Sequence, residues 1–139
     1  MKEYISKQQQ LLLPANQIFA LISSFNNLTP AVADKVEDWQ AMDDRCSFKV
    51  KGFTVMLKME ERVEPLRVKI VADEGCALPA DFAFWIQLQP VSEYDTRFRL
   101  VLHVELNMMM KMMIGGKIQK GLDQAVDGIA ASFAQAMRR

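Results

Sequence analysis

The sequence is poor in the side chains that most often carry chemistry. Histidine occurs once in 139 residues, and the only cysteines, Cys46 and Cys76, lie far apart without the short spacing of a metal or redox motif. No phosphate-binding loop, dinucleotide fingerprint or nucleophile elbow is present. We therefore expect no metal ion, no cofactor and two free thiols.

An excess of charge of one sign and long apolar runs are also lacking. Seventeen basic residues balance seventeen acidic ones, which argues against nucleic acid or an anionic membrane as the main partner. No stretch reaches the roughly 18 apolar residues of a membrane span. The opening MKEYISKQQQ has no apolar run of signal-peptide length. We expect one cytoplasmic domain over residues 1–139, without a membrane span.

The apolar pattern indicates one strand, then two helices, and then a run of strands. It predicts a strand from Tyr4 to Leu12, a helix from Pro14 to about Phe25 and a short helix from Thr29 to about Asp34. Apolar and polar residues then alternate in consecutive segments, which indicates an antiparallel sheet with one buried face. The inward positions are Cys46, Phe48, Val50, Val55, Leu57, Met59, Leu66, Val68, Ile70, Phe82, Phe84, Ile86, Leu88, Phe98, Leu100, Leu102 and Val104.

A long helix is predicted from Asn107 to Met137, with an apolar stripe from Ile114 to Ala136. At 1.5 Å per residue it would measure about 46 Å, longer than the roughly 37 Å diameter of such a domain. We expect the helix to bend at Gly115-Gly116, because two interior glycines weaken a helix. The order of elements predicts an α+β fold in which this helix covers the buried face of the sheet.

Methionine occupies five of the six positions from 108 to 113, shortly before the two glycines, in the stretch LNMMMKMMIGGKI. Methionine is unbranched and adapts to irregular shapes, so it specifies tight packing poorly. Three interpretations remain open: a wall of a ligand pocket, a filler of gaps in the core, or a surface for self-association.

The whole chain resembles the START-like superfamily, also called SRPBCC or polyketide cyclase/dehydratase and lipid transport proteins. The stretches that carry the resemblance are LPANQIFALISSFNNL, VEDWQAMDDRCSFKVKG, FAFWIQLQP, TRFRLVLHVELN and MMKMMIGGKIQKGLDQAVDGIA. The resemblance implies a helix-grip fold: a curved antiparallel sheet wrapped around a long C-terminal helix, with two short helices after the first strand. It also implies an apolar cavity between sheet and helix. Such a fold does not decide function, because members carry ligands or catalyse reactions.

Few side chains are candidates for catalysis in such a cavity. Counting by two from Met59 places Glu61 on the inner face, where it would be a weak candidate for a catalytic base; a bulge or the sheet rim would instead expose it. Lys111 is a second inward candidate, unless its amine reaches solvent. His103 shares a face with Arg97 and Arg99 and is expected to point to solvent.

The sequence therefore favours a carrier or binding protein for a small apolar or amphipathic molecule. The alternatives are a cyclase- or dehydratase-like enzyme that uses Glu61, and an interaction module, such as a homodimer, that uses the methionines. The residues expected to contact the ligand are Leu57, Met59, Glu61, Phe84, Ile86, Leu100, Leu102, Met109, Met110, Lys111 and Met113.

Overall fold

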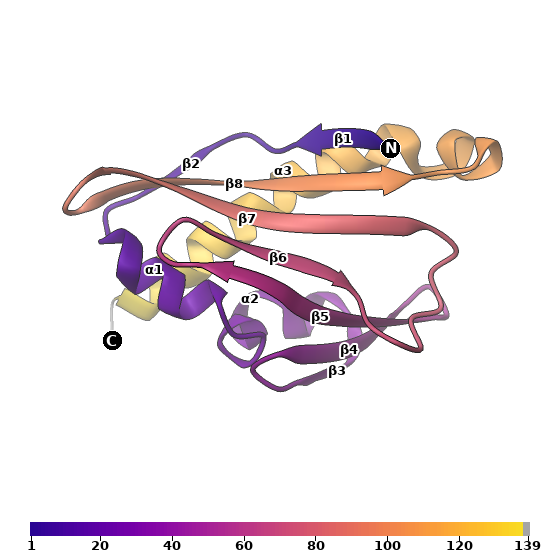
Figure 1. Ribbon diagram of the computed structural model, residues 1–139, viewed down its shortest axis with the longest axis horizontal. Helices are drawn as coiled ribbons and strands as arrows, with labels where there is room; N and C mark the ends of the chain where they lie inside the picture. Colours follow the sequence, from indigo (N-terminus) through magenta and orange to yellow (C-terminus); the bar gives the residue numbers. More distant parts are fainter. Residues whose placement is uncertain (138–139) are drawn as a thin grey trace.

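A computed structural model describes residues 1–137, and it contains one antiparallel sheet of eight strands (Figure 1). The strand order is β1-β8-β7-β6-β5-β4-β3, and β2 pairs with β8 after β1. The strands are β1 (Lys2–Ile5), β2 (Gln9–Leu11), β3 (Glu37–Ala41), β4 (Arg45–Val50), β5 (Phe53–Val63), β6 (Arg67–Ala72), β7 (Asp81–Ser92) and β8 (Asp95–Glu105).

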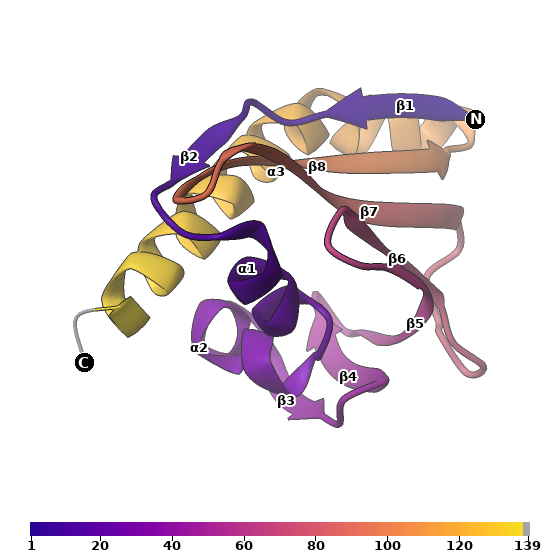
Figure 2. The same cartoon turned by 60° about the vertical axis from the view of Figure 1, so that its left-hand side comes forward.

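The helices gather on the inner side of this sheet. They are α1 (Ala15–Ile22), α2 (Thr29–Val32) and α3 (Met108–Met137), with short 3-10 turns at Asn26–Leu28 and Ala33–Lys35. Figure 2 shows the sheet curving around α1 and α2, while α3 runs along the side formed by β1, β2 and β8. The predicted helix-grip fold, with a curved antiparallel sheet and a long C-terminal helix, is confirmed.

The N-terminal strand differs from its prediction, because it is interrupted between Ile5 and Gln9. Ile5 lies opposite Val101 and Gln9 lies opposite Phe98, so the N-terminal segment has one residue more than its partner over this stretch. At the interruption the Ser6 hydroxyl is buried and accepts a hydrogen bond from the Leu100 amide at 2.8 Å. The pairing with β8 therefore resumes after a bulge instead of continuing as a single strand.

Helix α3 begins where the sequence predicts. The Asn107 side-chain oxygen accepts a hydrogen bond from the Met110 amide at 2.8 Å, which caps the first turn. The helix is continuous through Gly115 and Gly116. Its first turns and its yellow C-terminal turns nevertheless run in different directions (Figure 2). Ala136 is the last residue of the predicted apolar stripe, and its side chain lies outside the part of the chain that the structure describes.

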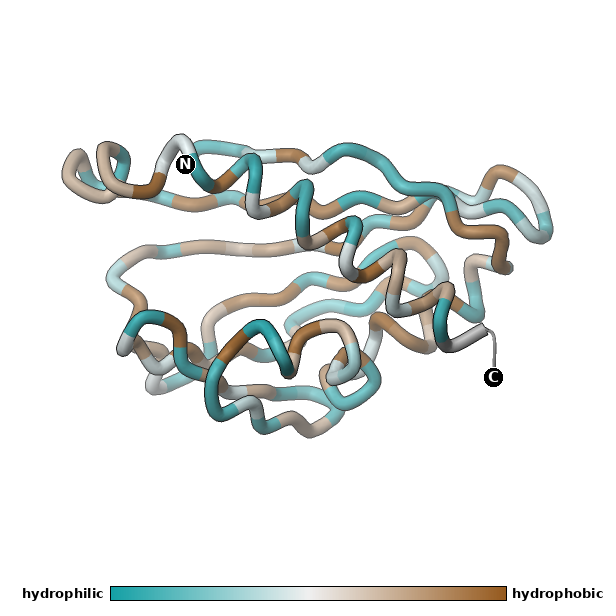
Figure 3. Tube along the Cα trace, turned by 180° about the vertical axis from the view of Figure 1, so that it is seen from behind, coloured by the Kyte–Doolittle hydropathy of each residue, from teal (hydrophilic) through white to brown (hydrophobic). Residues whose placement is uncertain are grey.

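The first turns of α3 extend beyond the end of the sheet, as the calculated length of the helix suggested. Figure 3 shows these apolar turns projecting past the strands. The side chains of Met108, Met109, Met112 and Met113 are between 65% and 84% exposed. At 1.5 Å per residue this helix of 30 residues is about 45 Å long, whereas the longest strand, β7 with 12 residues, spans about 40 Å.

Candidate ligand cavity

A cavity of about 500 Å³ lies between the inner face of the sheet and the helices. Five strands, from β4 to β8, contribute to its wall, together with Trp39 of β3 and residues of the helical segments. The lining residues are Phe25, Leu28, Val32, Trp39, Cys46, Phe48, Val50, Val55, Leu57, Ile70, Leu78, Ala80, Phe82, Phe84, Ile86, Leu100, Leu102, Val104, Leu106, Met110, Ile114, Ile118, Ala125 and Ile129.

The lining residues recur with the period of a strand on the sheet and with the period of a helix on α3. On β7 and β8 every second residue faces inward, and the register places Phe84 opposite Leu102 and Ile86 opposite Leu100. On α3 the lining residues recur every fourth residue at first, at Met110, Ile114 and Ile118. The inner face of the sheet and one stripe of the helix thus face each other across the cavity.

The lining is apolar on all sides. Among the described residues that line the cavity none carries a charge, and the only polar side-chain hydrogens belong to the indole of Trp39 and the thiol of Cys46. The Trp39 indole donates a hydrogen bond to the Thr29 hydroxyl at 2.9 Å. Burial raises the pKa of the Cys46 thiol to about 12, although a backbone hydrogen bond at Leu57 acts in the opposite direction. The described lining therefore suits an apolar molecule and contains no carboxylate, imidazole, amine or guanidinium group.

The structure brings six of the predicted ligand-contacting residues together around the cavity. They are Leu57, Phe84, Ile86, Leu100, Leu102 and Met110. Met59 also points inward and is 9% exposed, but it packs in the hydrophobic core and does not line the cavity.

Three residues at the start of α3 were placed wrongly at the cavity. Met109 and Met113 are 70% and 65% exposed, and Lys111 is also exposed. Consecutive helical residues are turned by about 100°, so a turn that points Met110 inward must point its neighbours sideways or outward. Because the first turns extend beyond the sheet, nothing in the described structure covers these side chains.

The expectation that Glu61 faces the cavity is also wrong. The register of β5 and β6 shifts between Met59 and Glu61, so Met59 lies opposite inward-facing Ile70, whereas Glu61 lies opposite Lys69 on the outer face. The Glu61 carboxylate accepts a hydrogen bond from Arg67 at 3.1 Å, with both side chains more than 40% exposed. A β-bulge therefore reverses the orientation that counting by two predicts.

His103 lies on the outer face of the sheet, as its strand position predicts. Its Nε2 is 2.7 Å from a Glu3 carboxylate oxygen, and its ring packs edge-on against Trp85 with centroids 4.6 Å apart. The Lys69 amine lies over the Trp85 ring, 5.4 Å from its centroid. These contacts belong to the outer surface of the sheet, on the face opposite the cavity lining.

Several lining residues could not be identified from the sequence as part of a site. Leu78 and Ala80 belong to the connection between β6 and β7, which has no periodicity. Phe25, Leu28 and Val32 have helical spacing, but that spacing predicts burial and not which side of the core they face.

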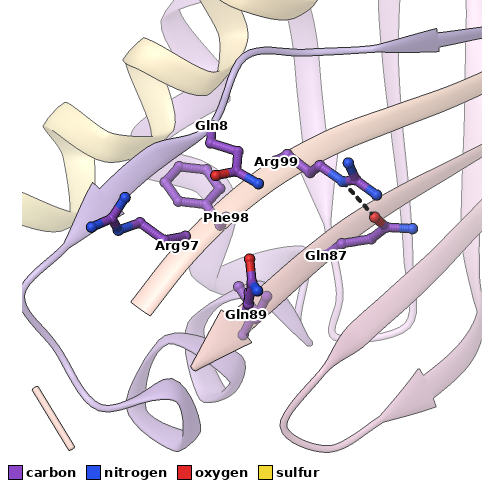
Figure 4. Close-up of a pocket in the computed structure, with 7 residues that line it drawn as sticks. Gln8, Gln87, Gln89, Arg97, Phe98 and Arg99 are labelled. Carbon is purple, nitrogen blue, oxygen red and sulfur yellow. Dashed lines mark hydrogen bonds between the residues drawn. The ribbon is translucent and has the colours of Figure 1, made fainter. Parts of the chain in front are cut away.

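A second depression, of about 300 Å³, lies on the outer face of the sheet (Figure 4). It is lined by Gln8, Gln87, Leu88, Gln89, Arg97, Phe98 and Arg99. Arg99 donates a hydrogen bond to Gln87 at 2.8 Å, and Arg97 forms an ion pair with Asp95 at 3.4 Å. The two guanidinium groups point away from each other in Figure 4, so they do not converge on one anion.

Metal-binding clusters and membrane-spanning helices are both missing from residues 1–137. In this range no three histidine, cysteine or acidic side chains are grouped so that they would hold a metal ion. None of the helices in the same range is both long and apolar enough to cross a membrane.

The similarity of this chain to known proteins lies in its structure. No protein-family model matches the chain, and no curated protein matches its sequence. The solved structure of TTHA0849 from Thermus thermophilus is similar, with a TM-score of 0.73 and 15% identity over 97% of this chain and 99% of that one. Norcoclaurine synthase from Thalictrum flavum, in complex with dopamine and hydroxybenzaldehyde, has a TM-score of 0.74 and 12% identity over 96% and 87%. At such low identity these similarities establish the fold alone.

Proposed function

We propose that this chain, which has the START-like helix-grip fold, binds a small apolar or amphipathic molecule in the cavity beneath its sheet. The observation that carries the proposal is a cavity of about 500 Å³ whose described lining contains no charged side chain. This volume lies within the roughly 300–1,000 Å³ typical of small-molecule sites, which are lined mainly by apolar and aromatic residues.

Aromatic side chains make the cavity suited to ring-containing ligands. The lining includes the aromatic residues Trp39, Phe48, Phe82 and Phe84. The ring centroids of Trp39 and Phe48 lie 5.9 Å apart. Ring faces and edges provide large apolar contacts with preferred offset or edge-on geometries. The norcoclaurine synthase complex, with two small aromatic compounds, is consistent with this use of the fold.

The geometry gives no support to an enzyme that uses Glu61 as its base. A general base must come within hydrogen-bonding distance of the proton that it removes. The Glu61 carboxylate is paired with Arg67 on the face of the sheet opposite the cavity. Binding or transport is therefore the function proposed here.

Adjacent methionines allow a matched test of the cavity. Met110 lines it, whereas Met109 is 70% exposed, so the two side chains experience different surroundings on the same turn of the helix. We expect Met110→Lys to weaken binding of an uncharged apolar fluorescent probe, such as Nile red, at least roughly tenfold, because the lysine charge would have to be desolvated next to the ligand. Met109→Lys should change the affinity less than about twofold, since its side chain stays in water.

The readout is a probe titration, with circular dichroism to verify that both variants are folded. Equal affinities for the two folded variants, or no saturable binding by the unmodified protein, would contradict the proposal.

A further inference from the structure

An apolar surface of unusual composition lies on the outer side of the first turns of α3. It consists of Met108, Met109, Met112 and Met113, each at least 65% exposed, and we refer to it as the methionine face. Large apolar side chains that are exposed together often mark an interaction surface, whereas scattered ones do not. At about 100° per residue these four side chains span an arc of about 140° on one side of the helix.

Lysines border the methionine face on both sides. By the same angular spacing, Lys111 lies about 60° from Met108 on one side, and Lys117 lies about 40° beyond Met113 on the other. Both lysines are exposed, and so is Lys120 one turn further along. In the described part of the chain, no acidic side chain forms an ion pair with any of the three.

Acidic groups are absent from this part of the helix. The first acidic residue of α3 is Asp123, which accepts a hydrogen bond from the Lys7 amide. Glu105 and Asp81 lie opposite each other at the adjacent strand ends. They face the outer side of the sheet, because their neighbours Val104 and Phe82 face the cavity. The balanced net charge of the whole chain therefore conceals a locally basic, apolar surface.

We infer that the methionine face, with Lys111 and Lys117 beside it, docks the protein on an anionic lipid surface. An apolar helical face with lysines along its borders lies in the plane of a membrane interface, with the apolar side chains among the acyl chains and the amines near the headgroups. A second copy of the chain fits less well. Pairing two methionine faces would bring lysines of both copies together without an acidic partner.

The position of the cavity supports this orientation. Met110 and Ile114, on the inner side of the same helical turns, line the cavity. Docking through the outer side would therefore bring a wall of the cavity to the lipid surface, where apolar ligands partition. This inference deepens the proposed function by naming lipid membranes as the source or destination of the ligand, but docking itself requires no ligand.

The test is co-sedimentation of the full chain with vesicles of phosphatidylcholine, with and without phosphatidylglycerol. We expect binding to the anionic vesicles only, and weaker binding at high salt because surface charge is screened. The double variant Met109→Gln/Met113→Gln should bind roughly tenfold more weakly, since its polar amides replace apolar contacts. Lys111→Gln/Lys117→Gln should lose roughly fivefold per lysine.

Met42→Gln is the matched control. Met42 is 64% exposed in the turn between β3 and β4, at the end of the antiparallel sheet opposite the start of α3. The Met42→Gln variant should bind vesicles with the same affinity as the unmodified protein. The inference is overturned if the unmodified protein ignores anionic vesicles, or if Met42→Gln and the double methionine variant lose affinity equally.

Light scattering tests whether a second copy of the chain, instead of a membrane, covers the methionine face. A dimer that dissociates in Met109→Gln/Met113→Gln would assign the methionine face to a second copy and overturn membrane docking. Probe titrations on the same proteins separate this inference from the proposed function, because the double methionine variant should retain its cavity. Failure of probe binding alone would refute the cavity proposal, while vesicle binding would still support the docking surface.

Discussion

Cys46 shows at the scale of a single residue how burial limits the chemistry of the cavity. Its side chain lines the cavity from β4 and is 6% exposed. Removal from water disfavours the thiolate and raises the pKa of the thiol to about 12, so the group is neutral at pH 7. Because the thiolate is the nucleophilic form, burial lowers the reactivity of the Cys46 thiol, and the side chain contributes a soft apolar contact.

The raised pKa predicts a loss of stability in alkaline solution. An unfolded thiol with an ordinary pKa of 9.0 ionises before the folded one does, so deprotonation favours unfolding. This contribution to stability is fully present below pH 9 and is lost as the pH rises through the folded pKa of about 12. We expect the free energy of unfolding, measured with urea, to fall less steeply between about pH 9 and pH 11 in Cys46→Ala. Identical slopes in the two proteins would contradict the assignment.

Glu61 and Arg62 show how one additional residue in a strand changes the role of its neighbours. After the bulge Glu61 lies on the outer face, and the next residue, Arg62, reaches the end of α1. The Arg62 guanidinium donates hydrogen bonds to the Ser23 carbonyl at 2.9 Å and to Asp44 at 2.7 Å. A positive charge at the C-terminal end of a helix is favourable, so the bulge has a structural role.

At the scale of elements, α3 combines two environments in one continuous helix. Its later turns carry buried Leu122, Val126 and Phe133, whereas its first turns extend into solvent. The glycines between these parts do not serve a close approach of another backbone. A Cβ built on Gly116 would have no heavy atom within 4 Å, and one on Gly115 would meet only the Lys111 Cβ at 3.9 Å.

Gly116→Ala should therefore stabilise the protein by about 0.5–1 kcal/mol, because alanine loses less backbone entropy in a helix and nothing obstructs its methyl group. Gly75→Ala is the contrasting variant. Gly75 has a φ of +89°, and its Cβ would lie 2.9 Å from the Met56 sulfur, so we expect destabilisation by more than about 1 kcal/mol. Urea unfolding measures both effects. A destabilising Gly116→Ala would instead indicate that the helix needs flexibility at this position.

At the scale of the whole molecule, binding and stability are linked. The cavity is lined by residues that are far apart in the chain, from Phe25 to Ile129, so unfolding destroys it completely. A ligand that binds only the folded state stabilises that state by mass action.

An apolar ligand at about 100 times its Kd should add roughly 2.7 kcal/mol to the free energy of unfolding. For a domain of this size that corresponds to a rise in melting temperature of several degrees. Differential scanning fluorimetry with candidate ligands checks this, and Met110→Lys provides the negative control. A ligand that raises the melting temperature of both proteins equally would be binding outside the cavity.

The sequence by itself determined the fold class, the long C-terminal helix and most of the inward positions on the strands. These features depend on local periodicity, which burial of one face imposes on strands and helices alike. It indicated six cavity-lining residues for the same reason. Only the tertiary structure decided the rest: the bulge that turns Glu61 outward, the overhang that exposes Met109 and Met113, and the addition of Leu78 and Ala80 to the wall. These features depend on strand register and on where elements end relative to one another, which no local pattern encodes.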